Sequence, residues 1–249
     1  MKRVKYRTEQ SIWSQGITNW DDFLKAKKIR GISDHRKKYY DRQLADAQSA
    51  LYSFNSRYFL ERLPQSETWR IYDFFKDQAV FLDIETTGVG SYDDITLIGL
   101  FDGLNTKTMI KSINMDYGSL REELSRYNLI ITFNGATFDV PFIKKRYPDV
   151  LPNVPNFDLR VACSRIGLKG GLKMIEKRLG IERNKIIEKI YNGDPLLLWK
   201  MFKGSGDDYY LNLLVEYNED DVFNLKKIAD YAYSELKKQT LKNGSVRES

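Results

Sequence analysis

The pattern of hydrophobic and polar positions changes character near residue 79 of the chain. Before that point, apolar residues recur every three or four positions, the spacing of one face of an amphipathic helix, as in Ala47, Leu51, Phe54 and Tyr58. Asn19 stands before Trp20 and two acids, which is typical of a helix start with a polar cap. We therefore predict that residues 9–75 are largely helical.

From residue 79 onward, short apolar runs separated by turn-forming residues predict strands. The predicted strands are 79–85, 95–101, 106–113 and 129–133, with a short extended segment at 156–159. Helices are predicted at 120–127 and 138–147, and the chain after residue 159 is expected to be mostly helical, with loops at 167–171 and 204–206. Strands that then alternate with helices indicate an α/β fold built in layers.

The charge divides the chain at the same place. Residues 1–78 contain 16 Lys or Arg and 10 Asp or Glu, whereas residues 79–249 contain 24 of each. The net charge of +6 therefore lies entirely in the first 78 residues. We predict three parts: a basic helical region at 1–78, an α/β domain at 79–236, and a polar tail at 237–249 that frays.

Composition excludes several classes of protein. Hydrophobic residues make up 42% of the 249 residues, enough for a packed core, so a disordered chain is excluded. No apolar run reaches the roughly 18–20 residues that span a bilayer, and residues 1–19 lack the apolar stretch of a secretory signal, so we expect a cytoplasmic protein without membrane association. With a single cysteine, Cys163, and a single histidine, His35, the chemistry must use carboxylates, hydroxyls and amines.

The basic N-terminal region has two interpretations. It holds 14 of the 33 aromatic residues, and a basic, aromatic segment suits nucleic acid because cations neutralise phosphates and rings stack on bases. Alternatively, the rings pack helices together and the charges form a solvated face. The basic residues that we expect to be exposed lie in 25–30 and 36–38, and the candidates among them for substrate binding are Lys27, Lys28, Lys37 and Lys38.

The segment 83–88 is the most informative one for chemistry. Asp83 and Glu85 are two residues apart in a predicted strand, so their side chains share one face. They could be solvent-facing acids on an edge strand, but the continuous apolar run before them favours a central strand. Two acids there are costly to bury unless a cation lies between them, and oxygen ligands suit Mg²⁺ or Mn²⁺.

Two further segments supply acids. Asp139 follows a predicted strand and an Asn-Gly turn, so it should lie early in the next helix. Tyr217 and Asp221 are four residues apart in a predicted helix, so they share one face. Taken singly, these segments are better explained as an ordinary turn and as surface acids.

Together, DIETTG at 83–88, NGATFD at 134–139 and YNEDD at 217–221 resemble the DEDD 3′–5′ exonucleases of the ribonuclease H-like superfamily, and the YprB-type branch is the most similar. The resemblance covers about 79–232. It implies a ribonuclease H-like mixed sheet flanked by helices, here with an N-terminal helical extension. Because Glu216 stands where the histidine branch has its histidine, the tyrosine branch, DEDDy, is the better match.

The resemblance also implies roles for particular residues. Two Mg²⁺ or Mn²⁺ ions would be held by the carboxylates of Asp83, Glu85, Asp139 and Asp221. Tyr217 would orient the attacking water. Thr86, Thr87 and Asn134 would lie near the terminal nucleotide. We expect Asp158, by contrast, to cap a helix, and Cys163 to be a packing residue.

The predicted function is therefore a metal-dependent 3′–5′ exonuclease that hydrolyses phosphodiester bonds of single-stranded nucleic acid. DNA is somewhat favoured as the substrate, although no motif encodes a preference for DNA over RNA. Two alternatives stay open: a ribonuclease H-like endonuclease acting, for instance, on RNA–DNA hybrids, and a catalytically silent scaffold that binds nucleic acid. A homo-oligomer is compatible with the sequence but is not deducible from it.

Overall fold

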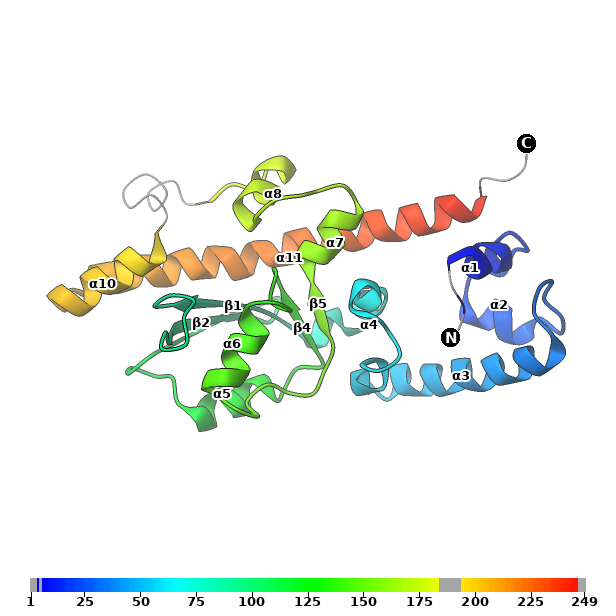
Figure 1. Cartoon of the computed structure of the whole chain (residues 1–249), viewed down its shortest axis with the longest axis horizontal. Coiled ribbons are helices and arrows are strands. Elements are labelled where there is room, and N and C mark those ends of the chain that lie inside the picture. The colour runs from blue at the N-terminus through cyan, green and yellow to red at the C-terminus, as the bar shows by residue number, and fades with distance from the viewer. Residues whose placement is uncertain (1–3, 5, 184–193, 246–249) are drawn as a thin grey trace.

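The computed structural model of the chain describes residue 4, residues 6–183 and residues 194–245 (Figure 1). The helices are α1 (Tyr6–Trp13), α2 (Trp20–Lys25), α3 (Asp34–Tyr52), α4 (Tyr72–Phe75), α5 (Tyr117–Leu124), α6 (Asp139–Arg146), α7 (Leu159–Arg165), α8 (Leu172–Leu179), α10 (Pro195–Ser205) and α11 (Asp208–Ser245). Short 3₁₀ helices are η1 (Ser56–Phe59), η2 (Gln65–Ile71) and η3 (Lys76–Gln78). The strands are β1 (Ala79–Thr86), β2 (Ile95–Phe101), β3 (Thr106–Ile110), β4 (Leu129–Thr132) and β5 (Asn156–Asp158).

The five strands form one mixed sheet in the order β3-β2-β1-β4-β5. β1 is the central strand and pairs antiparallel with β2 and parallel with β4. The outer pairs are β2 with β3, which is antiparallel, and β4 with β5, which is parallel. This arrangement confirms the predicted mixed sheet flanked by helices, and it confirms that β1 is central rather than an edge strand.

Both faces of β1 are covered by helices. Val80, Leu82 and Ile84 belong to a core that includes Leu120 of α5 and Ile143 of α6. The alternate residues Ala79 and Phe81 belong to a second core with Val222 and Leu225 of α11. Figure 1 shows α11 running across one side of the sheet, with α5 and α6 on the other side. Because side chains alternate along a strand, Asp83 and Glu85 must face α11.

The N-terminal region is helical but more broken than the spacing predicts. α3 ends at Tyr52, so the prediction that one helix continues to Tyr58 is wrong. Phe54 adopts the left-handed conformation (φ 54°), and the N–H of Asn55 donates back to the carbonyl of Ala50 (2.8 Å). This reversal ends the helix as a Schellman motif does, with Phe54 in the position that is usually glycine.

Two cores lie in this region. Ile12, Phe23, Ile29, Tyr40 and Leu44 form a small cluster of their own. The residues from Ala47 onward instead join the main core beneath α11. Trp69, for example, is 4% exposed and packs on Tyr233 of α11, with ring centroids 6.2 Å apart. The buried aromatic residues of this region are therefore packing groups, as the second interpretation predicts, whereas Tyr6, Tyr39, Tyr52 and Phe54 are exposed.

Lys37 is buried, contrary to the prediction from the sequence. It is only 6% exposed, its ammonium bonds to Asp41 (2.6 Å), and it lies 5.0 Å from the centroid of the Phe23 ring. The expectation that Lys37 is an exposed basic residue is wrong, because the first turns of α3 bring it against the small core. Lys27, Lys28 and Lys38 are exposed, as predicted.

Several predicted boundaries also change. β3 ends at Ile110 rather than at 113, and α10 continues through Ser205, so the predicted loop at 204–206 begins only at Gly206. α11 continues through Ser245, so residues 237–245 extend that helix rather than forming a separate tail, and residues 246–249 lie outside the described residues. None of the described helices combines the length and the apolar character that crossing a membrane requires.

Candidate metal centre

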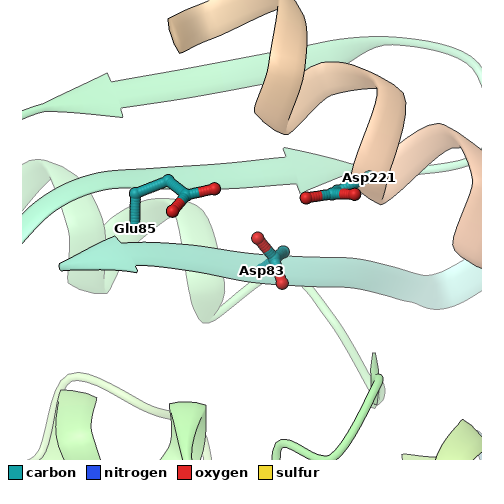
Figure 2. Close-up of side chains that lie close together, drawn as sticks. All are labelled: Asp83, Glu85 and Asp221. Carbon is teal, nitrogen blue, oxygen red and sulfur yellow. The ribbon is translucent and has the colours of Figure 1, made fainter. Parts of the chain in front are cut away.

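Three carboxylates meet where α11 crosses β1. Asp83 and Glu85 come from β1 and Asp221 from α11, and one oxygen of each lies within 4.8 Å of the other two. Figure 2 shows the three groups pointing toward one another. Glu85 is 9% exposed and Asp221 is 5% exposed, so the cluster is largely covered by protein. Three of the four predicted metal ligands are thus brought together.

The fourth predicted ligand, Asp139, lies beside this cluster rather than within it. It is the first residue of α6 and is 3% exposed. One of its oxygens accepts a hydrogen bond from the backbone N–H of Ile84 (3.2 Å). β1 pairs with β4 only from Ala79 to Phe81, so the N–H of Ile84 needs another partner, and Asp139 supplies it.

Asn218 ties Asp83 in place. Its side chain is completely buried, and Nδ2 donates to Oδ2 of Asp83 (2.8 Å). Gly99 of β2 makes room for it, because a Cβ at residue 99 would lie 1.7 Å from Oδ1 of Asn218. This Oδ1 is buried and has no hydrogen-bond partner among the described residues. Sequence reasoning missed Asn218, although its position three residues before Asp221 places both on one helix face.

The carboxylates of the cluster resist ionisation. Burial raises the pKa of Asp83 and of Glu85 well above the ordinary value, and the charges of Asp221 and Asp139 raise it further. Burial likewise raises the pKa of Asp139 to about 7. Burial also raises the pKa of Asp221, to about 6, although the neighbouring Arg183 opposes the shift. Buried acids that repel one another hold protons unless a cation compensates them.

The donor set fits a divalent cation. Three carboxylate oxygens in one cluster are the hard ligands that Mg²⁺ and Mn²⁺ prefer. A bound cation would also favour the ionised form of each acid. Asp83, Glu85 and Asp221 are therefore the residues that could hold a metal ion.

Tyr217 lies one turn before Asp221 on α11. It is half-buried, and its ring lies under two cations, with the Lys173 ammonium 5.1 Å and the Arg183 guanidinium 5.6 Å from its centroid. Burial, followed by the charge of Asp221, raises the pKa of its hydroxyl well above the ordinary value. The hydroxyl is therefore neutral near pH 7, so it can orient a water molecule by hydrogen bonding but cannot act as a base.

Arg183 is the second residue that sequence reasoning missed. Its side chain is 9% exposed, its Nη2 donates to Oδ1 of Asp221, and its Nε and Nη2 donate to the two oxygens of Glu176 (2.6 and 2.9 Å). Glu176 is itself 1% exposed. Arg183 and Asp221 are 38 residues apart, and nothing in the local sequence around Arg183 indicates the contact.

The residues predicted to lie near a terminal nucleotide are engaged in local hydrogen bonds. The hydroxyl of Thr86 donates to the carbonyl of Gly88 (2.8 Å), and that of Thr87 donates to Asp93 (3.1 Å). Asn134 has a left-handed backbone (φ 68°), and its Oδ1 accepts hydrogen bonds from Thr137 (2.9 Å) and Arg160 (2.9 Å).

Asp158 supports the turn that contains Asn134. Its two oxygens accept hydrogen bonds from the backbone N–H groups of Asn134 (2.9 Å) and Ala136 (3.1 Å). It also caps α7 by accepting from the N–H of Arg160 (3.0 Å), as predicted. Cys163 is fully buried in the main core, again as predicted.

Comparison with known proteins identifies the family. The model of the RNase H superfamily matches residues 80–233, a span that includes all five strands except Ala79 at the start of β1, and the cluster of carboxylates. No curated protein and no solved structure matches the chain. The chain belongs to the RNase H superfamily, whose members are usually nucleases that use divalent metal ions.

We predict that Asn218→Ala weakens Mn²⁺ binding by about 10–100-fold, because groups that orient metal ligands typically contribute that much. Gly99→Ala should weaken binding similarly, since its Cβ would displace the Asn218 side chain. Calorimetric titration with Mn²⁺ measures both effects. Asn212→Ala, at an exposed position of α11, and Gly204→Ala, which meets nothing within 4 Å, are the matched controls. Unchanged affinity in both test variants would contradict the role of Asn218.

We also predict that the metal-free protein loses stability as the pH rises from 5 to 8. The folded pKa of Asp139 is about 7 and that of Asp221 about 6, both above the ordinary value, so the folded state holds protons that the unfolded chain releases. The stability that these two groups contribute is therefore fully present below the ordinary pKa of 3.8 and is lost as the pH rises through 6 and 7. Thermal unfolding in EDTA measures this, with about 2–4 °C expected for each kcal/mol. Mn²⁺ or Asp83→Asn should flatten the dependence, and a Tm that rises with pH would refute the prediction.

Proposed function

We propose that this protein is a metal-dependent exonuclease that removes nucleotides from the 3′ end of single-stranded nucleic acid. The observation that carries the proposal is the convergence of Asp83 and Glu85 of β1 with Asp221 of α11, with Tyr217 one helical turn before Asp221. The match of residues 80–233 to the RNase H superfamily supports a nuclease. The order of the three acidic segments, with the tyrosine at residue 217, supports the DEDDy type.

The reaction is hydrolysis of the terminal phosphodiester bond. Two divalent ions, when bound, would supply Lewis acidity to the attacking and the leaving oxygen of an in-line displacement. Asp83, Glu85 and Asp221 would hold these ions, with Asp139 beside them. Tyr217 would orient the attacking water through its neutral hydroxyl. Water oxygen bonds to phosphorus and loses a proton, the bond from phosphorus to the 3′ oxygen breaks, and the 3′ oxygen gains a proton. The products are a nucleoside 5′-monophosphate and a strand that is shortened by one nucleotide and ends in a 3′ hydroxyl.

Digestion of matched DNA and RNA strands tests the proposal. Strands labelled at the 5′ end should shorten from the 3′ end only when Mg²⁺ or Mn²⁺ is present, and a blocked 3′ end should protect them. The double variant Asp83→Ala/Asp221→Ala, which lacks two of the three clustered acids, should be inactive. Cleavage of a circular single strand would show an endonuclease instead, since an exonuclease has no end there from which to start.

Tyr217→Phe removes only the hydroxyl. We expect cleavage to slow by about 10²–10⁴-fold, the usual contribution of a positioned catalytic group, whereas the affinity for Mn²⁺ should change little. Rates on a 5′-labelled strand and calorimetric titration separate the two effects. Tyr209→Phe, at an exposed position of the same helix, is the control. A full rate in Tyr217→Phe would exclude the tyrosine from the reaction.

The basic N-terminal region would guide the strand. The slope of log affinity against log salt is negative, and each phosphate contact on a single strand contributes about 0.7 to its magnitude. Replacing the exposed Lys27, Lys28 and Lys38 with Gln should therefore reduce the magnitude of the slope by about 2. Fluorescence anisotropy of a labelled strand at several salt concentrations measures the slope. Lys37→Gln, at the buried position, should lower the Tm without changing the slope. An unchanged slope in the triple variant would assign the region to packing alone.

A further inference from the structure

Arg183 is held beside the carboxylate cluster by a buried acid of its own. Nε and Nη2 form two nearly parallel hydrogen bonds with Oε2 and Oε1 of Glu176 (2.6 and 2.9 Å). Glu176 also accepts a hydrogen bond from Nδ2 of Asn224 on α11 (3.0 Å). The Glu176 side chain is 2% exposed and lies outside the cluster of three acids. Its partners identify it as the anchor that fixes the guanidinium.

The planarity of the guanidinium determines what the remaining N–H groups can do. One hydrogen of Nη2 points to Glu176 together with that of Nε, so the other hydrogen of Nη2 makes the bond to Oδ1 of Asp221. In a planar guanidinium, one hydrogen of Nη1 runs parallel to this second hydrogen of Nη2. Nη1 therefore presents an N–H parallel to the bond from Nη2 to Asp221, which is one of the three clustered acids.

Nη1 has no partner in the described part of the chain. The atom is buried and makes no hydrogen bond there, and the side chain as a whole is 9% exposed. A buried charged donor without an acceptor is destabilising, because it gives up the hydrogen bonds that it would make with water. Such an atom, beside a residue that could hold a metal ion, indicates that an acceptor from outside the chain completes the fork.

We propose that Arg183 binds a phosphoryl oxygen of the substrate, with Nη1 donating to an anionic oxygen adjacent to Oδ1 of Asp221. The proposal rests on the proposed nuclease function, which brings a phosphodiester to this cluster. An arginine suits the role because its fork of donors matches a pair of neighbouring anionic oxygens, here one from the carboxylate and one from the phosphoryl group. Arg183 is then a substrate-binding residue, and Glu176 is its positioning residue.

The charges around Arg183 are consistent with this role. The guanidinium lies 5.6 Å from the centroid of the ring of Tyr217, the residue that would orient the attacking water. Burial alone would lower the pKa of Arg183, but the charges of Asp221 and Glu176 outweigh burial and raise it, so the guanidinium stays cationic. A fixed positive charge at this position would attract a phosphoryl oxygen and would need no rearrangement to do so.

Binding of a nucleoside 5′-monophosphate without turnover tests the proposal. Thymidine and uridine 5′-monophosphates are titrated into the full chain at saturating Mn²⁺, with thymidine and uridine as references. In wild-type protein, at least one monophosphate should bind more tightly than its nucleoside. Arg183→Lys keeps a cation for Glu176 but loses the fork, so it should weaken monophosphate binding by about tenfold and leave nucleoside binding unchanged.

Controls separate this result from a loss of structure. Arg183→Ala should have a larger effect, but it leaves Glu176 without its cation, so the comparison rests on Arg183→Lys with its Tm measured. Because Arg183 also bonds to Asp221, the Mn²⁺ affinity of Arg183→Lys is measured separately, and each monophosphate titration uses a Mn²⁺ concentration that saturates the variant tested. Arg178→Ala, at an exposed position of α8, should behave as wild type.

Two results would overturn the assignment: Arg183→Lys binding the monophosphate as tightly as wild type, or wild type binding the monophosphate no better than the nucleoside. The digestion of end-labelled strands is scored separately. Arg183-dependent monophosphate binding in a protein that degrades no strand would overturn the exonuclease and support the phosphoryl site. If the protein degrades strands, and Arg183→Lys changes neither the degradation nor the binding of the monophosphate, the exonuclease is supported and the phosphoryl site is overturned.

Discussion

The mutual repulsion of Asp83, Glu85 and Asp221 is the constraint on which the centre of the molecule depends. These acids are held close together and are largely covered by protein, so each one raises the free energy of ionising the others. The protein supplies part of the compensation itself, through the Arg183 guanidinium on Asp221 and the Asn218 amide on Asp83. The rest is left to a divalent cation, and this links metal binding to the protonation and stability of the fold.

The packing of α11 against β1 creates this arrangement. The same helix face that buries Val222 and Leu225 in the main core also carries Asn218 and Asp221 to the strand. The absence of a side chain at Gly99 of β2 lets Asn218 approach. Core packing and the orientation of the acids are therefore not separable, and a change that shifts α11 would alter both.

The N-terminal region shows how far composition can be taken as evidence. Its charge and its aromatic content both suggest nucleic acid, yet many of the rings are buried, and Lys37 is drawn into the small core of Phe23 and Tyr40. A count of residue types does not separate a packed ring or lysine from an exposed one. Lys27, Lys28 and Lys38 are exposed and remain candidates for the electrostatic interpretation.

The sequence by itself determined the strands, the central position of β1 and the shared face of Asp83 and Glu85, because alternation along a strand is a local property that residue order specifies. Asp221 was identified only through the resemblance of the three ordered acidic segments to a known family. The sequence also identified Asp158 as a cap, since capping involves neighbours in the chain. The end of α3 at Tyr52 was missed because a left-handed Phe54 is an unusual way to close a helix. Only the tertiary structure placed Asp139 beside the cluster, brought Arg183 and Glu176 to Asp221, and buried Lys37. Apart from the contacts of Lys37 with Asp41 and of Arg183 with Glu176, these contacts join residues far apart in the chain. They form because buried charges and N–H groups require partners, and no local pattern predicts them.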